Sequence, residues 1–79
     1  MLDNKMTVTE KIAIINAQFD NMIAQVEPGR TVKRPAGEML VTQILENHRE
    51  GNIERAKGGR DVKIIIDAIN ETKQTHNLL

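Results

Sequence analysis

The sequence predicts an all-α fold: a small domain of three to four helices that associates as a homodimer. A chain of 79 residues has room for only a few elements around one core. Hydrophobic residues make up 39 % of it, and the formal net charge is zero, a combination that is atypical of disordered chains. Most apolar residues recur at helical spacing. We therefore expect one helical domain over residues 1–79, with frayed ends at 1–6 and 76–79.

The first helix is predicted over residues 8–27. Thr7 and Glu10 have the spacing of a capping box, in which each side chain bonds a backbone N–H near the other residue. Pro28 and Gly29 are expected to end the helix, because neither residue favours its continuation. Between these signals, apolar residues recur three or four positions apart: Val8, Ile12, Ile15, Phe19, Met22 and Val26.

A basic segment follows at residues 30–35, with the sequence RTVKRP. It is predicted to be a loop, with a very short strand over 31–33 as the alternative. A second helix is predicted over residues 36–49, because proline suits the first turn of a helix. Gly51 and Asn52 are expected to end it.

The last third of the chain is divided by two glycines, Gly58 and Gly59. Before them, residues 52–57 are predicted to form one or two helical turns. After them, Asp61 is expected to cap a last helix over residues 61–75. The run of isoleucines within it has high β propensity, so a strand over residues 62–66 remains the alternative.

The composition argues against an enzyme, and we expect no catalytic residues, metal or cofactor. The chain contains no cysteine and no serine, which excludes disulfides, thiolate ligands and the usual hydroxyl and thiol nucleophiles apart from threonine. Its two histidines, His48 and His76, lack carboxylates at metal-ligand spacing. For His48, a hydrogen-bonded position at the edge of the core is favoured over a functional role. Glu46 and Glu50 are expected to lie on a solvated helix face, not to form a catalytic pair.

The apolar faces are wide enough to contact more than one partner helix. Ile14 and Ile64 lie off the main stripes of their helices, which predicts an oligomer interface. The alternative is that the other two helices of the same chain cover both flanks. The predicted interface consists of Ile12, Ile14, Ile15, Phe19, Ile64 and Ile65.

Positive charge gathers in the middle of the chain and predicts a second kind of site. Residues 57–60 (KGGR) precede a helix N-terminus, where backbone N–H groups attract phosphate, although Asp61 opposes an anion there. The last helix is rich in isoleucine, which is atypical of a helix that recognises bases in a DNA groove. A ribbon-helix-helix arrangement fits the sequence only loosely. The one aromatic residue cannot provide the stacking surface by which proteins bind single-stranded nucleic acids. The candidate nucleic-acid or phosphate-binding residues are Arg30, Lys33, Arg34, Arg55, Lys57 and Arg60.

These observations predict a non-enzymatic regulatory or adaptor protein that acts by binding a protein partner as a homo-oligomer. The alternative is a protein that binds nucleic acid or a phosphate ligand through residues 30–34 and 55–60. Charges interrupt every apolar run before it reaches the length of about 20 residues that a membrane span needs, so we expect no membrane partner. The N-terminus lacks the apolar core of a signal peptide, which favours a cytoplasmic location.

Overall fold

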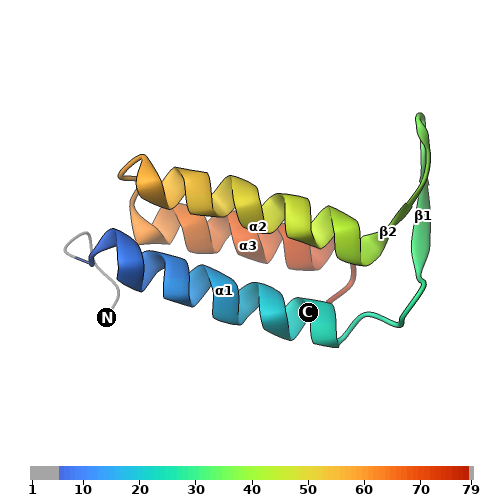
Figure 1. The fold of residues 1–79 in the computed structure, drawn as a ribbon, viewed down its shortest axis with the longest axis horizontal. Helices are drawn as coiled ribbons and strands as arrows, with labels where there is room; N and C mark the ends of the chain where they lie inside the picture. The colour runs from blue at the N-terminus through green and yellow to red at the C-terminus, as the bar shows by residue number, and fades with distance from the viewer. Residues whose placement is uncertain (1–5, 79) are drawn as a thin grey trace.

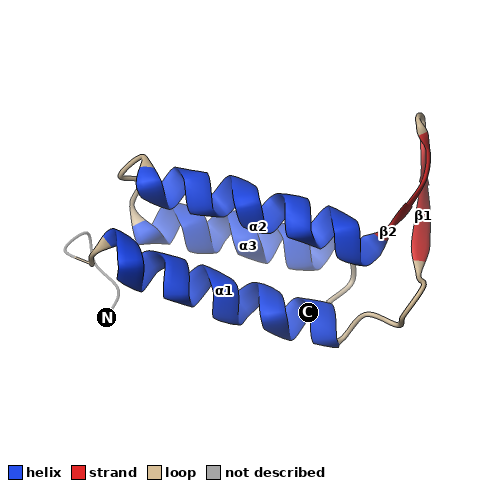
Figure 2. Ribbon diagram, in the orientation of Figure 1, coloured by secondary structure: helices blue, strands red, loops and turns tan. Residues whose placement is uncertain are grey.

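The computed structural model describes residues 6–78, which form three helices and one two-stranded antiparallel sheet (Figure 1). The prediction of a mostly helical chain is confirmed, and the sheet is an addition to it. Helix α2 packs against both α1 and α3, and the strands form a hairpin that projects from one end of the three helices (Figure 2). In chain order the elements are α1 (Val8–Ala24), β1 (Thr31–Arg34), β2 (Gly37–Leu40), α2 (Val41–Lys57) and α3 (Val62–Thr75).

The core lies between the three helices and includes the only aromatic residue, Phe19, which is fully buried. The predicted stripe of α1 supplies it together with Ile15 and Met22. Helix α1 begins with the predicted capping box between Thr7 and Glu10, and its helical residues end at Ala24, three residues before the predicted end. The other helices contribute Val41, Leu45, Ala56, Ile65 and Ile69.

Residues 31–40 form a β-hairpin, so the predicted loop over 30–35 is wrong for residues 31–34, and the predicted helix start at 36 is also wrong. The short strand that the sequence left as an alternative is present. Pro35 occupies a two-residue turn, where its fixed φ is as suitable as it is in a first helical turn, and Gly37 follows with φ +123°. Val32 pairs with Met39 in the register and packs against the core. The Val41 backbone N–H donates to the Arg30 carbonyl at 2.9 Å and closes the base of the hairpin.

Helix α2 continues through Gly51 to Lys57, so the predicted stop at Gly51 and Asn52 and the separate short helix over 52–57 are also wrong. The buried side chain of Asn52 donates to the His48 carbonyl at 2.9 Å, and Ala56 lies in the core. A glycine inside a helix costs about 1 kcal/mol relative to alanine. Packing of the second half of α2 outweighs that cost.

Helix α3 begins after Asp61, whose side chain accepts a hydrogen bond from the Lys63 backbone N–H at 3.0 Å. Residues 62–66 are helical as predicted, and the strand alternative is wrong. The segment that follows differs from the predicted frayed end, because His76 is buried and Leu78 packs against the core. The frayed ends predicted at 1–5 and at 79 lie outside the described residues.

Polar side chains tie α1 to the other two helices. Arg49 of α2 pairs with Asp20 at 2.7 Å, and the Lys73 ammonium of α3 donates to Gln18 at 2.7 Å. Both contacts join residues far apart in sequence. They therefore help to fix the orientation of α2 and α3 relative to α1.

Candidate functional site: a basic groove between α2 and α3

The predicted basic residues lie toward the two ends of the molecule. One group lies on or next to the hairpin, and the other lies at the end of α2 and in the turn that follows it (Figure 1). Lys57 forms an exposed ion pair with Glu54 at 3.4 Å, and the Arg60 carbonyl accepts a hydrogen bond from the Lys11 ammonium at 2.9 Å. Two members of the set, Arg34 and Arg55, face the same groove.

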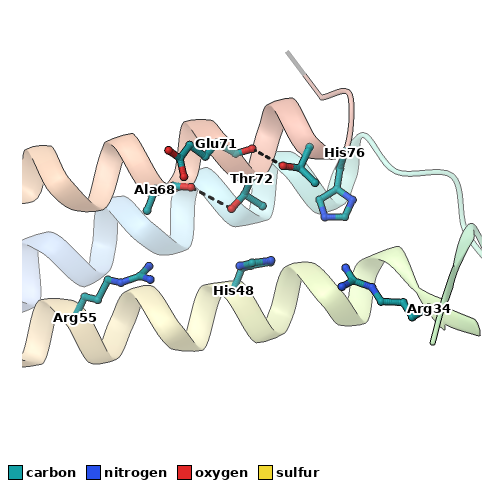
Figure 3. A pocket seen from close by; sticks show the side chains of 8 residues that line it. Arg34, His48, Arg55, Ala68, Glu71, Thr72 and His76 are labelled. Carbon is teal, nitrogen blue, oxygen red and sulfur yellow. Dashed lines mark hydrogen bonds between the residues drawn. The ribbon is translucent and has the colours of Figure 1, made fainter. Parts of the chain in front are cut away.

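This groove runs between α2 and α3 and has a volume of about 310 Å³. The guanidinium groups of Arg34 and Arg55 point toward one another along it, with His48 between them, and α3 forms the opposite wall (Figure 3). The residues that line it are Arg34, His48, Arg55, Ala68, Glu71, Thr72, Thr75 and His76.

Helical periodicity places these residues on two facing walls. On α2, His48 and Arg55 are seven positions apart and therefore share a face, with Asn52 between them. On α3, the lining positions between Ala68 and Thr75 repeat at intervals of three and four, and His76 caps the helix. Arg34 comes from β1, so the hairpin completes one end of the groove.

Hydrogen bonds inside the chain hold several of these side chains. The Arg55 guanidinium donates to the Asn52 side-chain oxygen at 2.9 Å. The hydroxyls of Thr72 and Thr75 donate to backbone carbonyls of α3 at 3.1 and 3.0 Å. The donors that remain available to a ligand are therefore the guanidinium and imidazole groups.

The two histidines meet across the groove. Their ring centroids are 6.5 Å apart in an edge-to-face arrangement, with an interplanar angle of 65°. His76 is only 6 % exposed, whereas His48 is exposed at the surface. Neither imidazole forms a hydrogen bond with another described residue. Both rings can therefore offer their nitrogens to a ligand.

Both imidazoles favour the neutral form more strongly in the groove than they would in water, because the pKa of each is lowered. Loss of hydration lowers the pKa of His48, and the charges of Arg34 and Arg55 lower it further. Burial likewise lowers the pKa of His76, and His48, Arg34 and Arg30 add to the effect. The positive surroundings that disfavour a protonated imidazole are those that favour a bound anion.

The charge balance of the lining residues is positive. Two guanidinium groups face one carboxylate, that of Glu71, which leaves a net charge of +1 while both imidazoles are neutral. The Arg34 side chain forms no hydrogen bond or ion pair with residues 6–78. The groove can therefore bind a negatively charged group of a ligand with a guanidinium that has no hydrogen-bond or ion-pair partner among the described residues.

The predicted oligomer interface is divided between the core and the surface. Ile15, Phe19 and Ile65 are buried in the chain's own core. Ile12 and Ile14 are partly buried. Ile64 is 53 % exposed and is the member of the set that is accessible at the surface.

The sequence interpretation missed the groove because it placed the end of the second helix before Arg55. His48 and Arg55 then belonged to different elements, although their spacing of seven was visible in the sequence. His76 was assigned to a frayed end. A continuous helix over residues 41–57 would have indicated that one α2 face carries both residues.

Two further features are absent from the described part of the chain. Residues 6–78 contain no group of three or more His, Asp or Glu side chains that could hold a metal ion. No helix within them is both long and apolar enough to cross a membrane.

No family model, curated protein or solved structure matches the chain.

Proposed function

We propose that this chain is a non-enzymatic binding protein that holds a phosphate group of its ligand in the groove between α2 and α3. The observation that carries the proposal is the meeting of Arg34 and Arg55 in one groove with both histidines of the chain. Guanidinium groups bind phosphate oxygens through paired hydrogen bonds, and a second cation nearby strengthens the attraction.

Phosphate fits this groove better than a carboxylate does. A phosphate presents three or four acceptor oxygens to donors on several sides, whereas a carboxylate presents two in one plane. Donors here come from β1, α2 and the end of α3. The volume of about 310 Å³ is some ten times the share of one water molecule in the liquid, so it also accommodates part of the group that carries the phosphate.

The phosphate can belong to a free nucleotide or to a nucleic-acid backbone, and one titration separates these sources. We would follow backbone amide and imidazole NMR signals while adding adenosine monophosphate or a short oligothymidylate. Binding of both at similar strength would indicate recognition of one phosphate. Stronger binding of the oligomer, with a steep loss of affinity as salt increases, would indicate a nucleic-acid backbone.

Substitutions identify the groove as the site. Arg34→Ala and Arg55→Ala should each weaken binding about tenfold or more, which corresponds to about 1.4 kcal/mol for a lost charged contact. Lys57→Ala is the matched control, because Lys57 is a cation of the same helix but does not line the groove. Equal losses for Lys57→Ala and Arg55→Ala would contradict the proposal, since they would show diffuse attraction.

A regulatory or adaptor role through self-association is a second proposal, supported by exposed apolar side chains. Ile64, in the first turn of α3, is 53 % exposed, and Val8, the first residue of α1, is 41 % exposed. These helix starts lie at the end of the molecule away from the hairpin (Figure 1). The proposal includes a protein partner and a cytoplasmic location.

Light scattering at low and high salt tests this second proposal. A dimer or larger assembly that persists in salt and becomes monomeric in Ile64→Asp would support it. Ile64→Asp is informative because the side chain is exposed, so the variant should still fold. A wild-type monomer at all concentrations would contradict self-association.

A further inference from the structure

We infer that the groove takes up its phosphate ligand together with protons, which are held by His48 and His76. This inference rests on the proposed function and adds a regulation to it, namely tighter binding at acid pH. Its geometric basis is the position of the two rings on opposite walls of one groove, 6.5 Å between centroids. An anion that binds in the groove beside this pair would lie close to both imidazoles.

Charged groups from every neighbouring element face the histidine pair. Arg34 projects from β1, Arg30 precedes that strand, Arg55 lies on α2, and Glu71 lies on α3. Three cations therefore act against one carboxylate. A proton added to either ring meets net repulsion, and each ring also opposes protonation of the other.

A bound phosphate reverses this balance. Without a ligand, burial and the neighbouring arginines lower the pKa of both histidines, so that both are mainly neutral near pH 7. A dianion in the groove favours the protonated rings, which raises each pKa when the ligand binds. By linkage, a ligand that raises a pKa binds more tightly as the pH falls. Full protonation would bring the net charge of the lining from +1 to +3.

Neither ring forms a hydrogen bond with another described residue. The ring nitrogens of both histidines are absent from the buried, unpartnered side-chain atoms of the described residues, so those of the largely buried His76 are accessible from the groove. Two ring nitrogens on each side thus remain for a ligand, and protonation would turn all four into donors.

The test requires a probe whose own charge does not change with pH. Sulfate and the phosphodiester groups of a short oligothymidylate keep their charge between about pH 5.5 and about pH 8, which spans the titration of histidine. We would measure the dissociation constant of each probe by calorimetry or NMR across this range. Each fully coupled proton raises affinity by up to about tenfold per pH unit, so we expect a gain of about tenfold between about pH 8 and about pH 5.5.

Substitution of the rings by a neutral amide assigns the protons. In His48→Gln the ratio of the affinity at about pH 5.5 to that at about pH 8 should fall, whatever the affinity at about pH 8, because glutamine does not titrate. His48 is exposed, so the variant should still fold. His76→Gln should act in the same direction. The imidazole NMR signals provide a second measurement, since the pKa of each ring should rise when sulfate is added.

The possible results separate the two proposals. Equal affinity for sulfate at about pH 5.5 and at about pH 8 would contradict proton uptake. It would not contradict the binding of a phosphate group in the groove. Sulfate affinity that still increases at acid pH in the variant with both His48→Gln and His76→Gln would also contradict the inference. Groups other than the two histidines would then take up the protons. Failure of the oligothymidylate, sulfate and adenosine monophosphate to bind at any pH would overturn both proposals.

Discussion

Asn52 accepts a hydrogen bond from the guanidinium of Arg55, three residues further along α2, at 2.9 Å. The same amide donates to the His48 carbonyl, also at 2.9 Å, and is 1 % exposed. A buried side chain therefore connects two lining residues of the groove. It restricts the guanidinium to an orientation in which it faces the groove, and this suggests that Asn52 is a positioning residue.

Asn52→Ala should weaken sulfate binding several-fold, because the Arg55 guanidinium would lose the partner that orients it. The substitution should also lower the free energy of unfolding by about 1–3 kcal/mol, the usual effect of removing a buried hydrogen-bonded group. Calorimetry and chemical denaturation measure the two effects. Asn47→Ala is the matched control, since Asn47 is an exposed residue of the same helix whose side chain accepts a hydrogen bond from Gln43. Unchanged sulfate affinity in a folded Asn52→Ala variant would contradict the positioning role.

The contact between α1 and α2 through Arg49 yields a second prediction. Arg49 bonds Asp20 at 2.7 Å and Asn16 at 3.3 Å, and its side chain is 18 % exposed. Arg49→Met keeps much of the apolar stem and removes these contacts. It should lower the free energy of unfolding by about 1–2 kcal/mol, because Asp20 is well exposed and its ion pair alone adds little.

Chemical denaturation followed by far-UV circular dichroism measures this change. Lys57→Met removes the exposed ion pair with Glu54 and should change stability by less than about 0.5 kcal/mol. Equal effects of the two substitutions would show that Arg49 contributes only as a surface charge.

Gly51 offers a test of how α2 is stabilised. It lies exposed inside the helix, and no atom lies within 4 Å of the position that a Cβ would occupy. Gly51→Ala should therefore raise the free energy of unfolding by about 0.5–1 kcal/mol, since alanine loses less backbone entropy on folding. In a domain of this size, that gain corresponds to a rise of about 2–8 °C in the melting temperature.

The control for this substitution is Gly59, which follows α2 with φ +83°. A side chain strains the left-handed conformation, so Gly59→Ala should destabilise the protein by about 1 kcal/mol or more. Thermal unfolding of the two variants should shift in opposite directions. A destabilising Gly51→Ala would mean that the helix needs the freedom of glycine at that point.

Local signals predicted the helices well where they agreed with burial. The Thr7 and Glu10 box, the stripe around Phe19 and the Asp61 cap each act within one or two turns of helix, and all are present in the structure. Pro35 and Gly51 were ambiguous, because each residue is compatible with two local structures. Burial decided between them, because Val32 packs against the core and Asn52 and Ala56 are buried.

The candidate site was less predictable because three separate elements build it. Charge clustering pointed to Arg34 and Arg55, but nothing local indicated that the hairpin would bring Arg34 to the same groove as α2. The role of His76 depends on the packing of the chain end after α3. The sequence alone therefore predicted candidate basic residues, but not which of them the fold would bring together in one groove.

The two histidines also make the stability of the ligand-free protein depend on pH. The pKa of His48 and that of His76 are lowered in the folded state, by loss of hydration first and by neighbouring positive charges second. In the unfolded chain both return to about 6.5. As the pH falls below this value, the unfolded state binds protons first, so the free energy of unfolding decreases until the pH passes the folded-state pKa.

We therefore expect lower stability at about pH 5 than at about pH 7.5 in buffers without phosphate or sulfate, with a slope of at most about 1.4 kcal/mol per pH unit for each proton. Both histidines should contribute, because loss of hydration lowers the pKa of each ring in the folded state. Glu10 does not contribute in this range, since hydrogen bonds from the Thr7 backbone and hydroxyl lower its pKa and move its titration further into acid.

Chemical denaturation at a series of pH values measures the slope, and the variant with both His48→Gln and His76→Gln is the control. That variant should lose the decrease in stability between about pH 7.5 and about pH 5, because neither glutamine titrates. Sulfate should reverse the trend in the wild-type protein, since a ligand that binds the protonated groove stabilises the folded state most at acid pH. A wild-type stability that is constant over this range would show that folding does not alter the affinity of the two rings for protons.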